Sequence, residues 1–234
     1  MKPALLSAAI FCASFAALPA AHAVDPGEVD TFSSGPEGWF AGGGPSSSVP
    51  PSPPAVVATG GPAGAGDSFL LLSALGGAGP GSRLVGMNAD QWAGNYTAAG
   101  IGAIAMDLRN LGTNDLSIRL FFEDPIPGPP ANQALTSFAV LLPAGGAWTH
   151  AVFPIAPASL TVVQGSASTL LANTTVLRIF SGVDPEFPPL AIAGALGIDN
   201  IQAIAAVPEP ATLALLGAGL GWMTLVTRRR RRPD

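Results

Sequence analysis

The chain has 234 residues, of which 48% are hydrophobic and only 11% are charged, with 29 glycines and 24 prolines. Five of the ten basic residues are arginines at positions 228–232, so the rest of the chain is acidic. An acidic body repels phosphate backbones, which excludes nucleic acid as an expected partner. The single cysteine, Cys12, lies near the N-terminus, so disulfides, thiolate catalysis and Cys/His zinc sites are not expected beyond it.

Residues 1–23 have the pattern of a secretory signal peptide. Lys2 supplies a positive charge, a short apolar run follows, and Ala21 and Ala23 occupy the small positions of a small-x-small cleavage pattern. The apolar run is short for a membrane span. We therefore expect the general secretory machinery to export the chain and the mature protein to begin at Val24. An N-terminal membrane anchor is the alternative.

Residues 24–206 are expected to form one all-β domain, because short runs of Val, Ile, Leu and Phe alternate with Gly, Pro, Asn and Asp. Many short strands at close spacing are typical of a β-sandwich or jelly roll. The expected strands are, in chain order, residues 68–72, 83–87, 101–108, 116–122, 137–142, 148–155, 176–180 and 197–204.

The connections between these strands lead to three further predictions. Residues 110–115 are rich in turn formers and predict a β-hairpin between the strands on either side. The Gly-, Ser- and Pro-rich residues 42–54 and the Pro-rich residues 124–130 are expected to be exposed loops. Residues 166–173 fit a brief helix capped by Ser166 or Ser168.

Trp92, Asn95 and Tyr96 cluster in a predicted loop and are the candidate glycan contacts. Sugar rings bind against aromatic faces that are flanked by polar side chains. The alternative is that the aromatic side chains pack in the core. That alternative is favoured for Trp39 and Trp148, which lie in apolar, strand-like segments.

The chain contains no Gly-x-Ser-x-Gly, phosphate-loop, dinucleotide-binding or His-Glu-x-x-His motif. Catalysis would have to depend on His150 or on the carboxylate pairs Glu123 with Asp124 and Asp184 with Glu186. Neighbouring carboxylates in exposed loops seldom hold the separation that a glycosidase needs. We therefore predict that the protein is not an enzyme and has no catalytic residues.

Residues 207–234 combine an extended motif, an apolar run and a basic end. Pro208 and Pro210 flank Glu209 and keep the backbone extended, which is the conformation a protease binds. Residues 211–227 are about the minimum length for a membrane-spanning helix. The terminal cluster would stay in the cytoplasm and leave the body in the periplasm. Its members are Arg228, Arg229, Arg230, Arg231 and Arg232.

This order of Pro-Glu-Pro, apolar span and terminal arginines resembles the PEP-CTERM sorting signal. The resemblance implies that an exosortase, a membrane enzyme of Gram-negative bacteria, cuts near residues 208–210. The protein would be anchored in the inner membrane before cutting and would then pass to the cell surface or extracellular matrix. A permanent single-span anchor, in which the prolines only start the helix, is the alternative.

The body resembles galactose-binding-like or carbohydrate-binding jelly rolls in residues 91–96, 106–112, 148–155 and 197–201. In such jelly rolls a structural calcium often joins the first and last strands, which implies Asp199 together with Asp30 or Glu28, and backbone carbonyls, as ligands. The alternative is that Asp199 and Asn200 form a turn and that Asp30 is a solvated residue at the start of a strand.

Together these patterns predict an exported, non-catalytic protein of the cell surface or of an exopolysaccharide (biofilm) matrix. The alternative is a lectin-like module that binds a matrix glycan. A secreted glycan-cleaving enzyme is favoured least.

Overall fold

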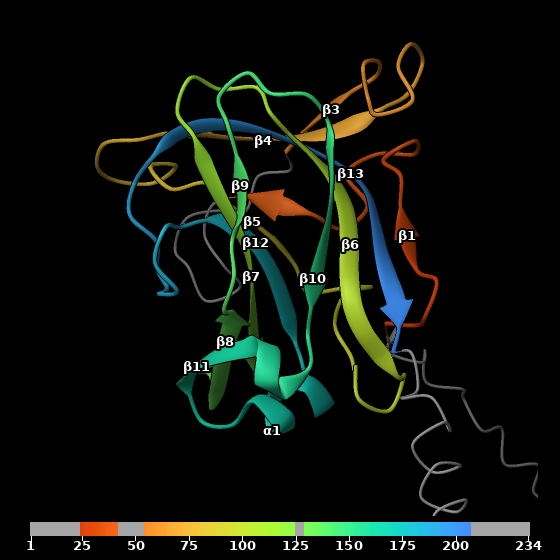
Figure 1. Ribbon diagram of the computed structural model, residues 1–234, viewed down its shortest axis with the longest axis vertical. Coiled ribbons are helices and arrows are strands. Elements are labelled where there is room, and N and C mark those ends of the chain that lie inside the picture. The colour runs from red at the N-terminus through yellow and green to blue at the C-terminus, as the bar shows by residue number, and fades with distance from the viewer. Residues whose placement is uncertain (1–23, 42–53, 125–128, 207–234) are drawn as a thin grey trace, which may run out of the picture.

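The computed structural model describes residues 24–41, 54–124 and 129–206 (Figure 1). Two antiparallel sheets pack face to face in these residues, which confirms the predicted β-sandwich. The predicted signal peptide, the tail from residue 207 onward and most of the predicted 42–54 loop lie outside the described residues. No helix among the described residues is long and apolar enough to cross a membrane.

The first sheet, sheet A, has the strand order β10-β6-β13-β4-β3, and β1 also pairs with β13 (Figure 1). The long strand β13 therefore borders three others, and it joins the N-terminal strand to the rest of the sheet. The strands of sheet A are β1 (Val29–Asp30), β3 (Ala55–Val57), β4 (Phe69–Leu75), β6 (Ile101–Asn110), β10 (Thr149–Pro154) and β13 (Ala193–Ala205).

The second sheet, sheet B, has the strand order β11-β8-β7-β12-β5-β2, and β9 also pairs with β7. Two short helices, η1 (Pro157–Ser159) and α1 (Ala167–Ala172), flank β11 in the chain. The strands of sheet B are β2 (Phe40–Ala41), β5 (Val85–Asn88), β7 (Leu116–Asp124), β8 (Asn132–Thr136), β9 (Val140–Leu142), β11 (Leu160–Gln164) and β12 (Val176–Ser181).

The main core lies between the two sheets and follows the alternation of side chains along each strand. Ile104, Met106 and Leu108 of β6 are fully buried, and Phe153 of β10 lies opposite Ile104 in the same layer. Alternation directs the intervening residues of β6, including Asp107, to the outer face of sheet A.

The predicted hairpin around residues 110–115 is wrong. β6 pairs with β10 and β13, whereas β7 pairs with β8, β9 and β12, so the connection crosses from one sheet to the other. The buried Asn110 fixes this crossing, since its amide donates to the carbonyls of Asn114 and Leu142 at 2.9 Å each. Both flanking strands have apolar residues that face the core, but β6 belongs to sheet A and β7 belongs to sheet B.

Two other local predictions have different outcomes. The short helix is confirmed as α1, whose N-cap Ser166 accepts a hydrogen bond from the backbone of Thr169. The predicted strand 137–142 is only partly right, because residues 137–139 turn between β8 and β9, and β8 was missed. Its sequence, Asn-Gln-Ala-Leu-Thr, begins with polar residues that hide the strand pattern.

The outer face of sheet B is covered over β7 and β12 by residues 182–192, the loop after β12. Phe187 of this loop stacks on Phe121 at 4.1 Å and meets Phe180 edge-on at 5.6 Å. The buried Arg119 donates to the carbonyl oxygens of Gly182 and Val183 and so fastens the loop to β7. A second, smaller apolar cluster therefore lies outside the sandwich core.

Candidate functional site

Trp92 and Tyr96 are both fully buried, at 0% exposure. The Tyr96 hydroxyl donates to the carbonyl of Trp92 at 2.7 Å, and its ring meets Phe122 edge-on. The prediction that these two aromatic residues bind a glycan is wrong, because both side chains point into the core and offer no face to a ligand. Asn95, between them, is exposed.

Asp30 is buried and accepts hydrogen bonds from two indoles. The Nε1 atoms of Trp39 and Trp92 each lie 2.6 Å from Asp30 Oδ2, and Gln91 donates to Oδ1 at 3.2 Å. Burial raises the pKa of Asp30 above its usual value, while the indole hydrogen bonds act in the opposite direction. Trp39 is confirmed as a core residue, whereas the same prediction for Trp148 is wrong, since Trp148 is only partly buried and donates to the Gly60 carbonyl at 3.0 Å.

The geometry gives the predicted calcium site no support. Strand β1 does pair with β13, so the first and last strands are neighbours as expected. However, the two indoles occupy Asp30 Oδ2, and Asp199 Oδ1 accepts from the backbone of Asn200 at 2.8 Å. Nowhere in the described part of the chain do three His, Cys, Asp or Glu side chains gather as metal ligands. Asp30 therefore does not fit a calcium-ligand role.

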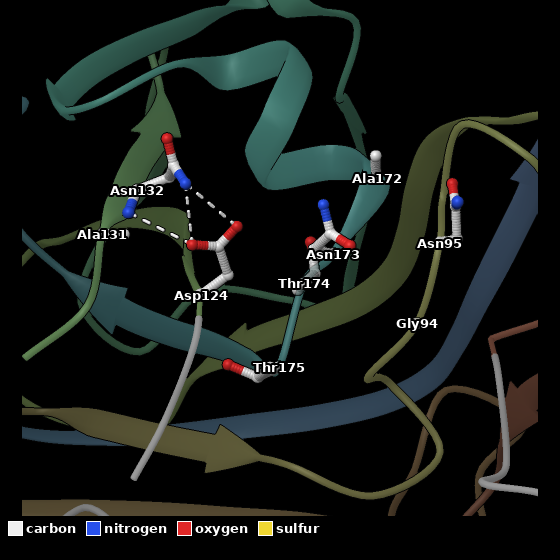
Figure 2. Close-up of a pocket in the computed structure, with 9 residues that line it drawn as sticks. All are labelled: Gly94, Asn95, Asp124, Ala131, Asn132, Ala172, Asn173, Thr174 and Thr175. Atoms are coloured by element: carbon white, nitrogen blue, oxygen red, sulfur yellow. Dashed lines mark hydrogen bonds between the residues drawn. The ribbon is translucent and has the colours of Figure 1, made fainter. Parts of the chain in front are cut away.

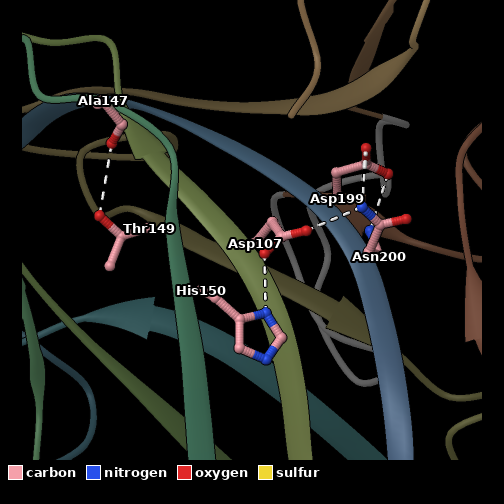
Figure 3. Close-up of polar contacts among 6 residues, drawn as sticks. All are labelled: Asp107, Ala147, Thr149, His150, Asp199 and Asn200. Carbon is pink, nitrogen blue, oxygen red and sulfur yellow. Dashed lines mark hydrogen bonds and ion pairs between the residues drawn. The ribbon is translucent and has the colours of Figure 1, made fainter. Parts of the chain in front are cut away.

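A polar row crosses the outer face of sheet A from β10 to β13 (Figure 3). His150 Nδ1 lies 2.9 Å from Asp107 Oδ1, and Asn200 donates to Asp107 Oδ2 at 2.9 Å. A β-bulge in β13 places Asn200 in the left-handed region, at φ 50°, which turns its amide toward β6. His150 is well exposed, so this row is open to solvent.

Asp199, which precedes Asn200 in β13, is the cross-strand partner of Asp107 and is 1% exposed. Burial raises its pKa to about 6, opposed by the hydrogen bond from the Asn200 backbone and reinforced by the negative charges of Asp67 and Asp107. The carboxyl group is therefore close to half-protonated in mildly acidic solution.

A separate open pocket of about 590 Å³ lies at one end of the sandwich, where α1 meets the end of β7 and the start of β8 (Figure 2). We call it the end pocket. It contains Asn95, which is the one predicted glycan contact that the structure leaves accessible. Its lining residues are Gly94, Asn95, Asp124, Ala131, Asn132, Ala172, Asn173, Thr174 and Thr175.

Asp124 and Asn132 form one wall of the end pocket (Figure 2). Asp124 Oδ1 accepts hydrogen bonds from the backbone and side-chain nitrogens of Asn132, at 3.1 and 2.9 Å. Asp124 Oδ2 accepts a longer hydrogen bond from the same side-chain nitrogen, at 3.2 Å. Asn132 Oδ1 in turn accepts from the backbone of Ser166 at 2.8 Å. The strand end and the start of α1 are thereby held together.

The opposite wall is fixed by the C-terminal end of α1. The Asn173 amide donates to the Thr169 carbonyl at 3.0 Å, and the Thr174 hydroxyl donates to the Leu170 carbonyl at 3.0 Å. The backbone of Gly94 donates to the Thr174 carbonyl at 2.8 Å, which brings the loop with Asn95 alongside the helix end. The pocket walls are thus supported by hydrogen bonds from three separate segments.

The carboxylate pair Glu123 and Asp124 is split between two faces. Because strand side chains alternate, Asp124 lines the end pocket while Glu123 points to the outer face of sheet B. There Glu123 Oε2 pairs with Arg178 Nη2 at 2.5 Å, and both side chains are buried. These two carboxylates therefore cannot act across one cleft.

Sequence reasoning missed Asp124 and Asn132 as pocket residues. The Pro-rich segment between them was interpreted as an ordinary loop, and nothing in it showed that its two flanks would converge. A polar residue on each side of such a loop, at a strand end and a strand start, is the pattern that would have indicated them.

Comparison with protein-family models matches residues 206–232 to the PEP-CTERM protein-sorting motif. This match confirms the predicted sorting motif and implies an exported protein that is processed at the membrane by an exosortase. No curated protein matches the chain in sequence.

Among solved structures, the chain is similar to a family 11 carbohydrate-binding module from Clostridium thermocellum in complex with a β-1,3-1,4-mixed-linked tetrasaccharide, with 17% identity and a TM-score of 0.52. It is also similar to the solution structure of CtCBM11, with 17% identity and a TM-score of 0.50. Each similarity covers 80% of this chain and 99% of the other. At this identity the likeness shows the fold alone, a jelly roll of the carbohydrate-binding-module type.

Proposed function

We propose that this protein is an exported, non-catalytic glycan-binding protein of the cell surface or exopolysaccharide matrix of a Gram-negative bacterium. The general secretory machinery would deliver it, and an exosortase would cut it near Pro208, Glu209 and Pro210. The sorting motif at residues 206–232 is the observation that supports export and processing. The end pocket is the observation that supports ligand binding.

The end pocket suits a sugar in size. Pockets of about 300–1,000 Å³ hold small ligands, and the volume of about 590 Å³ lies within that range. Three asparagines, two threonines and one aspartate are among its lining residues, but most of the surface that the lining exposes to the cavity is apolar. The exposed amide of Asn95 can hydrogen-bond to a hydroxyl of a sugar ring. The opening to solvent leaves room for a polymer to continue beyond the bound residue.

A purely structural matrix protein is the second candidate. Aromatic side chains usually supply much of the contact with a sugar ring, and the lining of the end pocket contains none. This observation favours weak binding or none. A glycan-cleaving enzyme is not favoured, because Glu123 and Asp124 point to opposite faces of β7.

The sorting part of the proposal is tested by the intact mass of the mature protein from its host, with and without the exosortase. We expect the residues after the Pro-Glu-Pro motif to be lost only when the enzyme is present. Retention of the arginine-ended tail in both strains would contradict processing and would indicate a permanent anchor.

The binding part is tested by titrating the purified protein with exopolysaccharide isolated from the same host. Saturable binding that is absent with an unrelated exported protein of similar charge is the expected result. Binding no stronger than that of the control protein would refute the glycan-binding role and leave the structural one.

A further inference from the structure

The charged residues are unevenly distributed along the chain and over the fold. Residues 125–177 contain no Asp, Glu, Lys or Arg, and His150 is their one titratable side chain. Their described part forms β8, β9, β10, η1, β11 and α1. Residues of β8, β9, β10 and η1 line one small groove, so these elements lie side by side (Figure 1). We call the side of the sandwich that they form the uncharged side.

The remaining elements carry a strong excess of negative charge. The described ranges hold thirteen acidic residues against four arginines, and two of these arginines, Arg119 and Arg178, are buried with partners inside the protein. A large net charge of one sign keeps the copies of a protein apart. Two copies therefore repel each other least when their uncharged sides meet.

The uncharged side also contains the least protected sheet edge. Natural edge strands are usually short, bulged or charged, which prevents them from pairing with another chain. At the other sheet ends, β2 has two residues, β3 has three, and the register of β11 is interrupted. Strand β10 has six residues, a continuous register with β6 and a proline only at its end, Pro154. Among the described residues, no strand lies beyond β10 in sheet A.

The free backbone groups of β10 follow from its pairing with β6. The N–H of Ile155 donates to the Gly102 carbonyl at 3.0 Å, and alternate residues of an antiparallel strand direct their backbone groups to the same partner. Residues in phase with Ile155, such as Ala151, therefore bond to β6. The N–H and carbonyl groups of His150 and Val152 point away from β6, to the free edge.

We infer that two copies of this protein pair along β10 as an antiparallel, two-fold symmetric dimer centred on Ala151. This register places His150 of one copy opposite Val152 of the other, so the free N–H and carbonyl groups of both residues are paired. Sheet A would then continue through both copies. The dimer would also shield Phe138, which is 81% exposed and lines the small groove with Val152. This association does not require that the protein binds a glycan.

The first test is the mass of the full-length protein in detergent, measured by sedimentation equilibrium over a dilution series. A reversible dimer is expected, and its dissociation constant should fall as salt is raised, because salt screens the repulsion between two acidic copies. Val152→Glu should raise that constant at least about ten-fold, since it adds a negative charge to each copy at the junction.

Val56→Glu is the matched control for this substitution. Val56 is an exposed valine in β3, at the opposite edge of the same sheet, so the change adds the same charge away from the junction. It should leave the dissociation constant of the dimer unchanged.

The second test addresses strand pairing and register. Val152→Pro removes an N–H that points away from β6, so the monomer should fold and the dimer should be lost. A mixture of His150→Cys and Val152→Cys proteins should form a disulfide-linked dimer under mild oxidation, because the proposed register places these two positions within disulfide reach. Either cysteine variant alone should form much less of it, since identical positions are not opposite each other.

A monomer at every protein and salt concentration would overturn the inference and leave the edge to a different partner. Equal effects of Val152→Glu and Val56→Glu, or a dimer that persists in Val152→Pro, would also overturn it. Cross-linking that is no greater in the mixture than in the single variants would reject the register, and this comparison decides the matter even if Val152→Pro folds poorly. Glycan binding by a protein that stays monomeric would reject the dimer but leave the proposed function standing.

Discussion

The outer faces of the two sheets use charged residues in opposite ways. On sheet B, Arg119, Glu123 and Arg178 are buried beneath the 182–192 loop, and their partners lie within the protein. On sheet A, the row from His150 to Asn200 is open to solvent. The charges on sheet B are therefore part of the packed fold, whereas the polar side chains of the row on sheet A face solvent.

The difference arises from what covers each face. Phe187 and its neighbours shield sheet B from water, so an unpaired charge there would be costly. Among the described residues nothing comparable covers His150, so its contact with Asp107 is screened by solvent. We therefore expect the two contacts to differ widely in their effect on stability, although their lengths are similar.

The largest expected effect comes from Glu123→Ala, which leaves Arg178 buried without its carboxylate. We expect a loss of about 3–5 kcal/mol in the free energy of unfolding, measured by urea denaturation. The double variant Glu123→Ala with Arg178→Met should recover most of this loss, because it removes both charges. An equal loss in the double variant would show that packing, not the unpaired charge, is responsible.

Phe187→Ala should uncover the outer face of sheet B at a cost of about 2 kcal/mol, since the ring is half-buried against Phe121 and Phe180. Leu190→Ala in the same loop is the control, because Leu190 is 86% exposed. Thermal unfolding of both variants measures the difference. Equal midpoints would contradict the role assigned to Phe187 as the cover.

Asp199→Asn should alter how stability depends on pH. The folded pKa, about 6, is higher than the ordinary value of 3.8, so the folded state holds the proton more tightly than the unfolded state. Stability from this group is therefore complete below about pH 4 and lost as pH rises through 6, by about 1 kcal/mol or more. Denaturation midpoints at several pH values should show this decline in the wild type and a smaller one in the variant. Identical slopes would contradict it.

The smallest effect is expected from His150→Gln. The pair with Asp107 is solvent-exposed on the histidine side, so its loss should cost less than about 1 kcal/mol. A loss of unfolding free energy as large as that in Glu123→Ala would contradict the proposed difference between the buried pair on sheet B and the exposed contact on sheet A.

The sandwich could be predicted because strand alternation is local, as in residues 116–122, where every second side chain enters the core. The partners of a strand are not local, which is why residues 110–115 resembled a hairpin turn although they connect two sheets. Trp92 was misplaced for the same reason, because its partner Asp30 is 62 residues away. No residue near Trp92 in the sequence indicates that its indole N–H group donates a hydrogen bond to a buried carboxylate.

The end pocket depends still more on tertiary structure. It joins Asn95, Asp124, Asn132 and the end of α1, and only Asn95 among these was singled out for binding. The sorting motif was predictable because its features are consecutive in the chain, and the family-model match at residues 206–232 confirms that motif.

The most direct test is whether ligand binding belongs to the end pocket or to the open face of sheet A. Affinity for the host exopolysaccharide should be measured for two matched variants, Asn95→Lys in the pocket and His150→Lys on the open face, both at exposed positions. We predict that Asn95→Lys weakens binding strongly and that His150→Lys leaves it unchanged. Loss of binding in His150→Lys alone would place the glycan on sheet A and contradict the assignment of the end pocket.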